Sequence, residues 1–299
     1  MPIWNAIVTA INSVTAGVFS LSSQEAIRGG CINEAWKLSG VMQTGDSIVP
    51  CHYFVKLNDK QRSSMFTAES EALLQIAATK TVSVPQPIVS GVTAEQCWLV
   101  LEYIELTTAV SAVQLGRQLA DMHRHTADSF GWHRNNTIGS TVQINKKTNS
   151  WIEFWREQRL GYQLQLAAQQ GYGGQLQQLG QCLMSKLDIF FDQYNPSASL
   201  LHGDLWGGNW SGTSNGNPVI FDPATYYGDR ETDIAMTELF GGFPPDFYAA
   251  YTEQWPLQSN YPIRKKLYNL YHILNHLNLF GESYSAQAES MMKSLLAEI

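Results

Sequence analysis

The stretch that most constrains this chain spans residues 201–222 and combines a polar loop with a hairpin signal. The loop reads Leu-His-Gly-Asp-Leu-Trp-Gly-Gly-Asn-Trp and carries Asp204 and Asn209. The pair Asn215-Gly216 then precedes an apolar run that ends at Asp222, and Asn-Gly is the strongest short signal for a β-hairpin. A hairpin at this point turns the chain back on itself. We therefore predict that Asp222 returns alongside Asn209.

The three side chains at this stretch are oxygen-bearing groups that suit phosphoryl transfer. Asp204 can accept the proton of an attacking hydroxyl, while Asn209 and Asp222 can hold Mg²⁺, a hard cation that shares oxygen ligands with phosphate. The pattern His-x-Asp-x4-Asn, followed by a strand ending in Asp, is the catalytic-loop pattern of kinases, with Gly203 where protein kinases carry Arg. A lone His-Gly-Asp is a common loop tripeptide, so the prediction depends on the agreement of spacing and turn. Together they predict an ATP-dependent kinase of small molecules.

Composition excludes several other classes of protein. With 299 residues, 44% hydrophobic and 15% charged, the chain is globular and long enough for one large domain or two lobes. A formal net charge of −7 argues against a nucleic-acid partner, which requires clustered Lys and Arg. The four cysteines have no metal-ligand spacing, so we expect reduced thiols in the cytoplasm. We find no signal peptide and no apolar run that could cross a bilayer, and expect no membrane partner.

The first hundred residues begin with apolar residues at helical spacing, which predict an amphipathic helix over residues 3–15. Residues 27–38 then read as two strands around Gly29-Gly30. Paired glycines let backbone N–H groups approach a polyphosphate, but a plain hairpin turn has the same signature, and both interpretations stay open.

A β-rich run carries one lysine, Lys56, among mostly apolar residues. A charge buried in a sheet needs a partner; the alternative is an edge strand with Lys56 facing water. In the helical pattern that follows, Glu69 lies on the stripe with Phe66 and Leu73, whereas Glu71 points elsewhere. We predict that Glu69 orients Lys56, as the helix glutamate of a kinase orients the strand lysine that holds the α- and β-phosphates.

An apolar strand at residues 97–101 leads into the mixed segment Glu102-Tyr103-Ile104. Such a segment suits a hinge whose backbone groups hydrogen-bond adenine. After residue 107 the pattern becomes mainly helical, which predicts a boundary between two lobes near residue 105.

The remaining two thirds of the chain read as mainly helical. A helix is predicted over residues 112–126, and its His123 is interpreted as a core or surface histidine because no third metal ligand is near. The glutamine-rich residues 163–181 read as a solvated helical face. Asp233 lies near a predicted helix start, where a carboxylate meets unpaired N–H groups, and we predict a structural role for it in bracing the catalytic loop.

These motifs, together with Val84-Pro85-Gln86-Pro87 and Phe130-Gly131-Trp132, make nearly the whole chain similar to the fructosamine kinase (ketosamine 3-kinase) family. An Asp-Leu-Trp loop running through Gly-Asn, with Asp-Pro-Ala after it, is typical of this family. Aminoglycoside phosphotransferases share the His-Gly-Asp and the Asn but usually not that tryptophan. The resemblance implies an α+β, two-lobed, protein-kinase-like fold, with a small mainly β lobe over residues 1–105 and a larger mainly α lobe over residues 106–299.

The resemblance also implies an activity. It is the phosphorylation, with ATP and Mg²⁺, of the 3-hydroxyl of a ketosamine, either a small molecule or a glycated protein lysine. The phosphate becomes a leaving group once the adjacent ketosamine enolises, so the result is deglycation. Whether the sugar is a ribulosamine, an erythrulosamine or a fructosamine, and whether the chain is a monomer or a homodimer, stay open.

The residues then take the following expected roles. Asp204 is the base, and Asn209 and Asp222 hold Mg²⁺. Trp206 forms a wall against the sugar, or is a core aromatic. The expected ATP-binding residues are Lys56, Glu69, Gly29, Gly30, Cys31, Glu102, Tyr103 and Ile104, and the expected structural ones are His202 and Asp233.

Two questions remain open at the level of sequence. Cys31, in the phosphate loop, is either a redox switch, which needs an accessible thiol of lowered pKa, or an inert small residue. The competing functions are a kinase of the same fold for another alcohol, such as an aminoglycoside or a choline-like molecule, and a non-catalytic ATP-binding protein. The intact Lys56, Asp204, Asn209 and Asp222 argue against the latter.

Overall fold

The computed structural model describes residues 3–28 and 32–299, so the predictions for Gly29, Gly30 and Cys31 fall outside the described residues. The chain divides into two compact units. The first comprises the described residues of Met1–Val110 together with Ser211–Phe221, and the second comprises Ser111–Trp210 and Asp222–Ile299.

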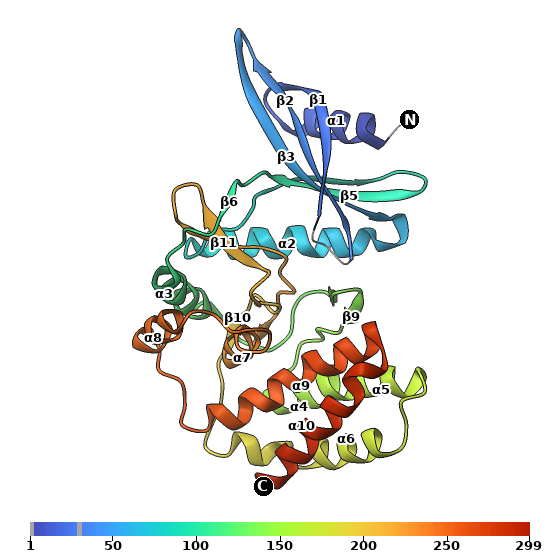
Figure 1. The fold of residues 1–299 in the computed structure, drawn as a ribbon, viewed down its shortest axis with the longest axis vertical. Helices are drawn as coiled ribbons and strands as arrows, with labels where there is room; N and C mark the ends of the chain where they lie inside the picture. Colours follow the sequence, from blue (N-terminus) through green and yellow to red (C-terminus); the bar gives the residue numbers. More distant parts are fainter. Residues whose placement is uncertain (1–2, 29–31) are drawn as a thin grey trace. The chain divides into compact units, whose positions relative to one another are not determined.

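The first unit is built on an antiparallel sheet, shown in Figure 1. Its five strands lie in the order β1-β2-β3-β5-β4, so β3 and β5 are internal. The strands are β1 (Val18–Ile27), β2 (Glu34–Thr44), β3 (Ser47–Asp59), β4 (Pro87–Val92) and β5 (Gln96–Glu102). The two apparent strands predicted on either side of Gly29-Gly30 are therefore present as β1 and β2.

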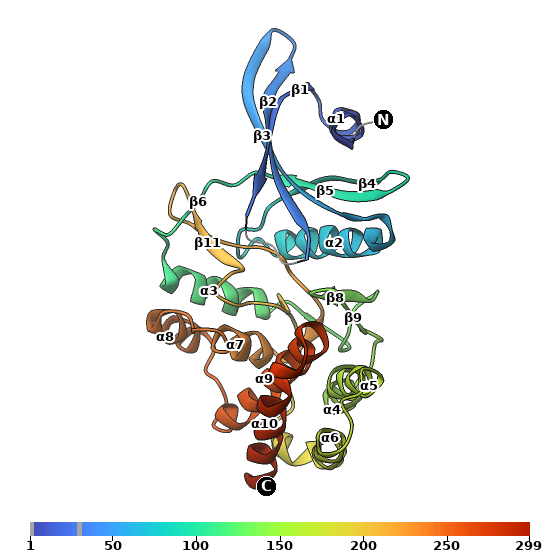
Figure 2. The same cartoon turned by 45° about the vertical axis from the view of Figure 1, so that its right-hand side comes forward.

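Two helices, α1 (Ile3–Val14) and α2 (Ser63–Thr79), flank this sheet, as Figures 1 and 2 show. The predicted amino-terminal helix is confirmed. Successive side chains of a strand point to opposite faces. Val55 and Leu57 of β3 accordingly join the apolar cluster around Ile7 and Ile11 of α1, while Lys56 between them meets α2.

The Asn-Gly hairpin is present and belongs to the first unit. It consists of β11 (Trp210–Thr213) and β12 (Pro218–Ile220), which form a three-stranded sheet with β6 (Leu106–Thr107). The Gly216 N–H donates to the Thr213 carbonyl at 2.8 Å, closing the turn. Val219 also forms a parallel bridge with Ser83, which ties the hairpin to the chain that follows α2.

The second unit is mainly helical. Its helices are α3 (Ala112–His123), α4 (Trp151–Trp155), α5 (Tyr162–Gln169), α6 (Gln175–Ser185), α7 (Glu231–Thr237), α8 (Pro245–Gln254), α9 (Tyr261–Phe280) and α10 (Ser285–Ala297). A π-helical turn, η2 (Arg156–Gly161), joins α4 to α5. The 3-10 turns of this unit are η3 (Leu187–Phe191) and η4 (Glu282–Tyr284), and the first unit contains the 3-10 turn η1 (Lys60–Arg62). The short strands are β7 (Thr126–Ala127), β8 (Asn136–Ile138), β9 (Thr141–Gln143), β10 (Ala198–Leu200) and β13 (Tyr227–Gly228).

Two expectations for the second unit are wrong in detail. The helix predicted over residues 112–126 ends at His123, because Thr126 pairs with Ser199 in the sheet β13-β10-β7. The glutamine-rich segment is not uniformly solvated. Gln163 is fully buried, and its side chain donates to Asn275 at 3.2 Å and accepts from Asn278 at 2.7 Å. Amide partners on α9 thus allow a polar residue to occupy the core.

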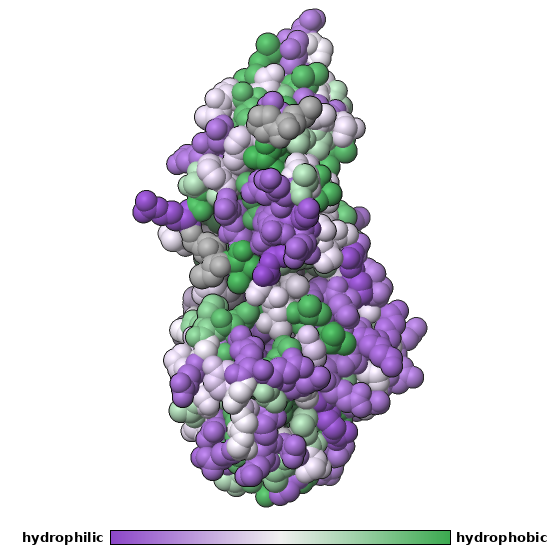
Figure 3. Space-filling model, turned by 90° about the vertical axis from the view of Figure 1, so that its right-hand side faces the viewer, coloured by the Kyte–Doolittle hydropathy of each residue, from purple (hydrophilic) through white to green (hydrophobic). Residues whose placement is uncertain are grey.

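Among residues 3–28 and 32–299, none of the helices has the length and apolar character needed to cross a membrane. The face in Figure 3 shows hydrophilic residues lying between hydrophobic ones. Small groups of exposed apolar residues among polar ones are normal for a folded protein.

Candidate active site

The loop between β10 and β11 carries the predicted catalytic aspartate and asparagine. The Asn209 amide donates to the Asp204 main-chain carbonyl at 2.8 Å, and its nitrogen lies 3.4 Å from Asp204 Oδ2. Asn209 is buried, whereas Asp204 is only partly buried. Because the Asn209 nitrogen is engaged inside the loop, its side-chain oxygen is turned away from the Asp204 carbonyl and can accept a ligand.

The main chain of this loop is held by Asp233 of α7. Asp233 accepts the N–H of His202 at 2.7 Å and that of Gly203 at 2.8 Å. His123 Nε2 lies 3.1 Å from Asp233, and its Nδ1 lies 2.8 Å from the Tyr251 hydroxyl. Burial acts to raise the pKa of Asp233, but its interactions with His123, followed by those with His202 and the Gly203 N–H, outweigh burial and leave the pKa below its usual value. These contacts support the predicted structural role of Asp233 and add His123, which was expected to be an ordinary core or surface residue.

Gly203 occupies the position where protein kinases carry arginine, and the local geometry explains the glycine. Its φ is +84°, and a Cβ atom there would lie 2.2 Å from the Ala224 carbonyl oxygen. No side chain fits without displacing the main chain after Asp222. The neighbouring His202 is fully buried, and the Asp204 N–H donates to its Nδ1 at 3.3 Å. His202 thus shapes the loop from inside, as expected.

Asp222 lies exposed at the end of the hairpin, with a left-handed backbone φ of +60°. Such a conformation is uncommon for a residue other than glycine and is typical of constrained sites. Burial, followed by the charges of Asp222 and Asp233, raises the pKa of Asp204 to about 7. Asp222 therefore lies close enough to Asp204 for its charge to act on that carboxyl group, and a bound cation would favour the charged form of Asp204.

The main chain that follows Asp222 rests on amide side chains from the β8–β9 hairpin. Asn136 donates to the Thr225 carbonyl at 2.8 Å, and Gln143 donates to the Ala224 carbonyl at 3.0 Å. Both side chains are buried. Sequence reasoning did not identify these residues, although the run of Asn, Thr and Gln in a polar stretch was a signal for them.

A buried arginine supports the same hairpin. Arg159, on the π-helical turn, donates to Asn145 at 2.8 Å, and Asn145 in turn donates to Asn136 at 2.8 Å. Its guanidinium lies over the ring of Tyr226, 4.1 Å from the centroid. π-helical turns are rare and are often found at functional sites. Here the turn carries the Arg159 cation, which contacts the segment after Asp222 through the ring of Tyr226.

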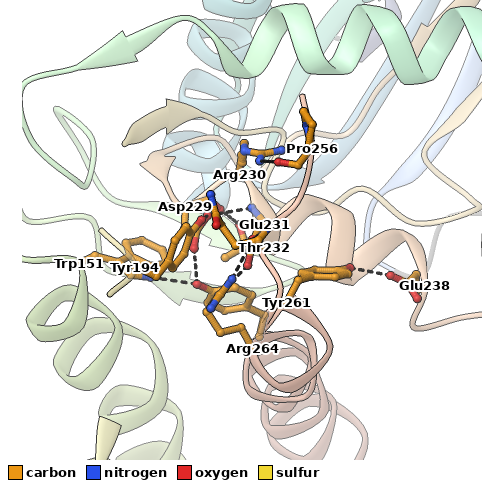
Figure 4. Close-up of polar contacts among 12 residues, drawn as sticks. Trp151, Tyr194, Asp229, Arg230, Glu231, Thr232, Glu238, Pro256, Tyr261 and Arg264 are labelled. Atoms are coloured by element: carbon orange, nitrogen blue, oxygen red, sulfur yellow. Dashed lines mark hydrogen bonds and ion pairs between the residues drawn. The ribbon is translucent and has the colours of Figure 1, made fainter. Parts of the chain in front are cut away.

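The start of α7 is held by a second buried network, shown in Figure 4. The main-chain N–H of Glu231 donates to Asp229 at 3.0 Å, and Tyr194 donates to the same carboxylate at 2.8 Å. Arg264 binds Glu231 through two hydrogen bonds, of 2.7 and 3.0 Å. Burial raises the pKa of Asp229, and the hydrogen bond from Tyr268 opposes this shift. The network fixes the helix turn that carries Asp233.

In the first unit, Lys56 and Glu69 form the predicted ion pair. Lys56 Nζ lies 2.6 Å from Glu69 Oε1, and the side chains are 6% and 9% exposed. The edge-strand alternative is wrong, because β3 lies between β2 and β5. Helical periodicity therefore selected the correct glutamate of α2.

We expect Glu69→Gln to raise the KM for ATP about tenfold or more, because a hydrogen bond to a charged partner contributes about 1.5–3 kcal/mol. The amide of Gln still reaches Lys56 but no longer holds it by charge. Steady-state kinetics with varied ATP measure the change. Glu71→Gln on the same helix is the control, and an equal effect of both variants would contradict the assignment.

Two further predicted groups have defined surroundings. Glu102 ends β5, and its main-chain N–H donates to the Gln86 carbonyl at 2.8 Å. The first N–H of the predicted hinge is therefore engaged within the protein. Tyr103 and Ile104 follow and are half-buried. Trp206 is 39% exposed, so its interpretation as a core aromatic is wrong. A Cβ on Gly208 would lie 2.3 Å from the Trp206 ring, which shows that this ring lies against the glycine backbone.

No group of three or more His, Cys, Asp or Glu side chains in the described part of the chain has the arrangement of a metal site. Mg²⁺ that is shared with nucleotide phosphates needs only one or two carboxylates from the protein. Asn209 and Asp222 supply one amide oxygen and one carboxylate, so the donor set fits this ion.

Comparison with known proteins identifies the family to which the chain belongs. A family model described as fructosamine kinase matches residues 3–298. The chain is 44% identical over 296 residues to a probable ketoamine kinase of Synechocystis, covering 98% of this chain and 97% of that protein. It is 40% identical over 275 residues to the chloroplastic protein-ribulosamine 3-kinase of Arabidopsis thaliana, covering 91% and 82% of the two chains.

Solved structures show the same fold. A Haemophilus somnus protein, provisionally named a fructosamine-3-kinase, superimposes with a TM-score of 0.86 at 28% identity, covering 98% of this chain and 97% of that one. An ADP-bound aminoglycoside phosphotransferase superimposes with a TM-score of 0.64 at 10% identity, covering 98% of each chain, which shows similarity of fold alone. The predicted α+β, protein-kinase-like fold class is confirmed. On these matches, together with its own catalytic-loop geometry, the chain belongs to the fructosamine kinase family.

Proposed function

We propose that this protein is a ketosamine 3-kinase that transfers the γ-phosphoryl group of ATP to the 3-hydroxyl of a ribulosamine or fructosamine. The observation that carries the proposal is the loop geometry. Asn209 donates to the Asp204 carbonyl, and the charge of Asp222, after burial, raises the pKa of Asp204. The names of the relatives, ketoamine kinase and protein-ribulosamine 3-kinase, support the substrate class. We further propose a cytoplasmic protein, monomeric or homodimeric, that acts on small ketosamines or glycated protein lysines.

Asp204 is the proposed base. Its carboxylate accepts the proton of the acceptor hydroxyl, and a raised pKa makes it a better proton acceptor at neutral pH than an ordinary aspartate. Asn209 and Asp222 would hold Mg²⁺, which when bound neutralises charge on the transferring phosphoryl group. Asp233 keeps the loop amides fixed, so the carboxylate of Asp204 does not reorient during the reaction.

ATP is proposed to be held by residues of the first unit. Lys56, kept in place by Glu69, binds the α- and β-phosphates. Gly29, Gly30 and Cys31 are proposed to approach the phosphates, and Glu102, Tyr103 and Ile104 to meet the adenine. On the acceptor side, Trp206 is proposed to lie against the sugar, since its exposed ring is two residues from Asp204.

The test is Mg²⁺-dependent ATP consumption measured with ribuloselysine, fructoselysine and an aminoglycoside in parallel. We expect turnover on at least one ketosamine and none on the aminoglycoside. The ratio of kcat/KM for the two ketosamines then gives the sugar preference. Turnover on the aminoglycoside alone, or on no substrate, would contradict the proposed acceptor.

A further inference from the structure

A continuous row of aromatic rings runs away from the catalytic loop within the second unit. The ring centroids of Trp206 and Phe240 are 6.4 Å apart, those of Phe240 and His276 are 4.9 Å apart, and those of His276 and Phe280 are 5.3 Å apart. Tyr284 lies 5.2 Å from His276 and 6.4 Å from Phe280. We call these five residues the aromatic row.

Four parts of the fold assemble this row. Trp206 belongs to the catalytic loop, and Phe240 follows the end of α7, the helix that anchors that loop. His276 and Phe280 are one helical turn apart on α9, a spacing that places them on the same side of the helix. Tyr284 follows at the end of η4. The row is therefore attached to the same helices that position Asp204.

The aromatic row is largely accessible. Trp206 is 39%, Phe240 36% and Phe280 54% exposed. Single exposed apolar residues need no explanation, but a contiguous set of exposed rings that begins beside a catalytic residue is typical of a binding surface. Its five rings, with neighbouring centroids 4.9–6.4 Å apart, also offer more aromatic surface than a single sugar covers.

The charges within the segments that carry the rings limit what these segments can bind. The segments that carry the rings, residues 206–210, 240–243 and 276–284, contain neither Lys nor Arg, and their one carboxylate is Glu282. Burial lowers the pKa of His276, which favours the neutral form of its ring. These segments thus offer aromatic faces and no cation for a free carboxylate.

We propose that the aromatic row binds the polypeptide on either side of a ketosamine-bearing lysine, an inference that rests on the proposed function. A ketosamine of a free amino acid carries an α-carboxylate, for which these segments supply no basic partner. Within a polypeptide the same lysine has neutral amides instead, and neighbouring side chains can pack on the rings. Trp206 then faces the sugar, while Phe240, His276, Phe280 and Tyr284 contact the chain that carries it.

The experiment compares two substrates with the same ribulosamine. One is the adduct of butylamine, and the other is the adduct of a lysine at the centre of a nine-residue peptide with apolar neighbours and blocked ends. The full-length wild type, Phe280→Ala and Tyr284→Ala are assayed on both. Ile189→Ala, which removes an equally exposed apolar side chain from η3, is the matched control.

For Phe280→Ala we expect the ratio of kcat/KM on the peptide to kcat/KM on the butylamine adduct to fall about tenfold, mainly through the KM for the peptide, since aromatic anchors dominate such surfaces. Tyr284→Ala should change the ratio in the same direction, and Ile189→Ala should not change it. An unchanged ratio in both aromatic variants, or an equal loss on both substrates, would overturn the inference and leave the proposed function standing. A wild type with no turnover on either adduct would instead overturn the proposed function, and the inference with it.

Discussion

The Asp204→Asn variant is expected to lose about 10²–10⁴-fold in kcat with a ketosamine substrate, the usual contribution of a positioned general base. Asparagine has nearly the shape of aspartate but cannot take the proton of the acceptor hydroxyl. The measurement is kcat from Mg²⁺-dependent ATP consumption, with nucleotide affinity measured separately by calorimetry. Asp46→Asn, which alters an exposed aspartate of the β2–β3 turn, is the control for loss of a negative charge.

The same variant should fold at least as well as the wild type. Burial and the nearby carboxylates of Asp222 and Asp233 raise the pKa of Asp204, so the ionised form is unfavourable in the folded protein. A neutral side chain removes this repulsion, and the midpoint of urea unfolding should stay the same or rise. Normal turnover by a variant that still binds ATP would show that Asp204 is not the base.

The Arg264→Met variant is expected to lose about 3–5 kcal/mol in the free energy of unfolding, the typical cost of leaving one partner of a buried ion pair uncompensated. Arg264 is 1% and Glu231 0% exposed as side chains, and their closest contact is 2.7 Å (Figure 4). The guanidinium also lies 3.9 Å from the centroid of the Tyr194 ring, so its loss removes packing as well. Denaturant unfolding monitored by tryptophan fluorescence measures the change.

A second variant separates the charge from the packing. Combining Arg264→Met with Glu231→Gln removes the stranded carboxylate, and we expect it to recover part of the lost stability. Lys265→Met, next along α9, breaks the half-exposed pair with Glu238 and should cost less than about 1 kcal/mol. Equal losses for Arg264→Met and Lys265→Met would show that burial of the pair has no part in its effect.

The sequence determined the local parts of the site. The spacing of Asp204 and Asn209 and the Asn-Gly turn before Asp222 define one loop and one hairpin, both short-range structures set by neighbouring residues. The helical period likewise selected Glu69 rather than Glu71 as the partner of Lys56, because Glu69 shares the buried stripe of α2 with Phe66 and Leu73. In both cases the signal comes from residues close together in the sequence, so local conformation is enough to predict it.

Only the tertiary structure identified the residues that hold these parts in place. Asn136 meets the Thr225 carbonyl 89 positions away, His123 meets Asp233 110 positions away, and the aromatic row joins the catalytic loop to α9. Nor did the sequence indicate that the hairpin would belong to the first unit while Asn209 and Asp222 belong to the second. A buried polar side chain is stable only where a partner satisfies it, and an exposed ring becomes part of a surface only beside other rings. Both conditions depend on which distant segments the fold brings together, and local propensity carries no information about that.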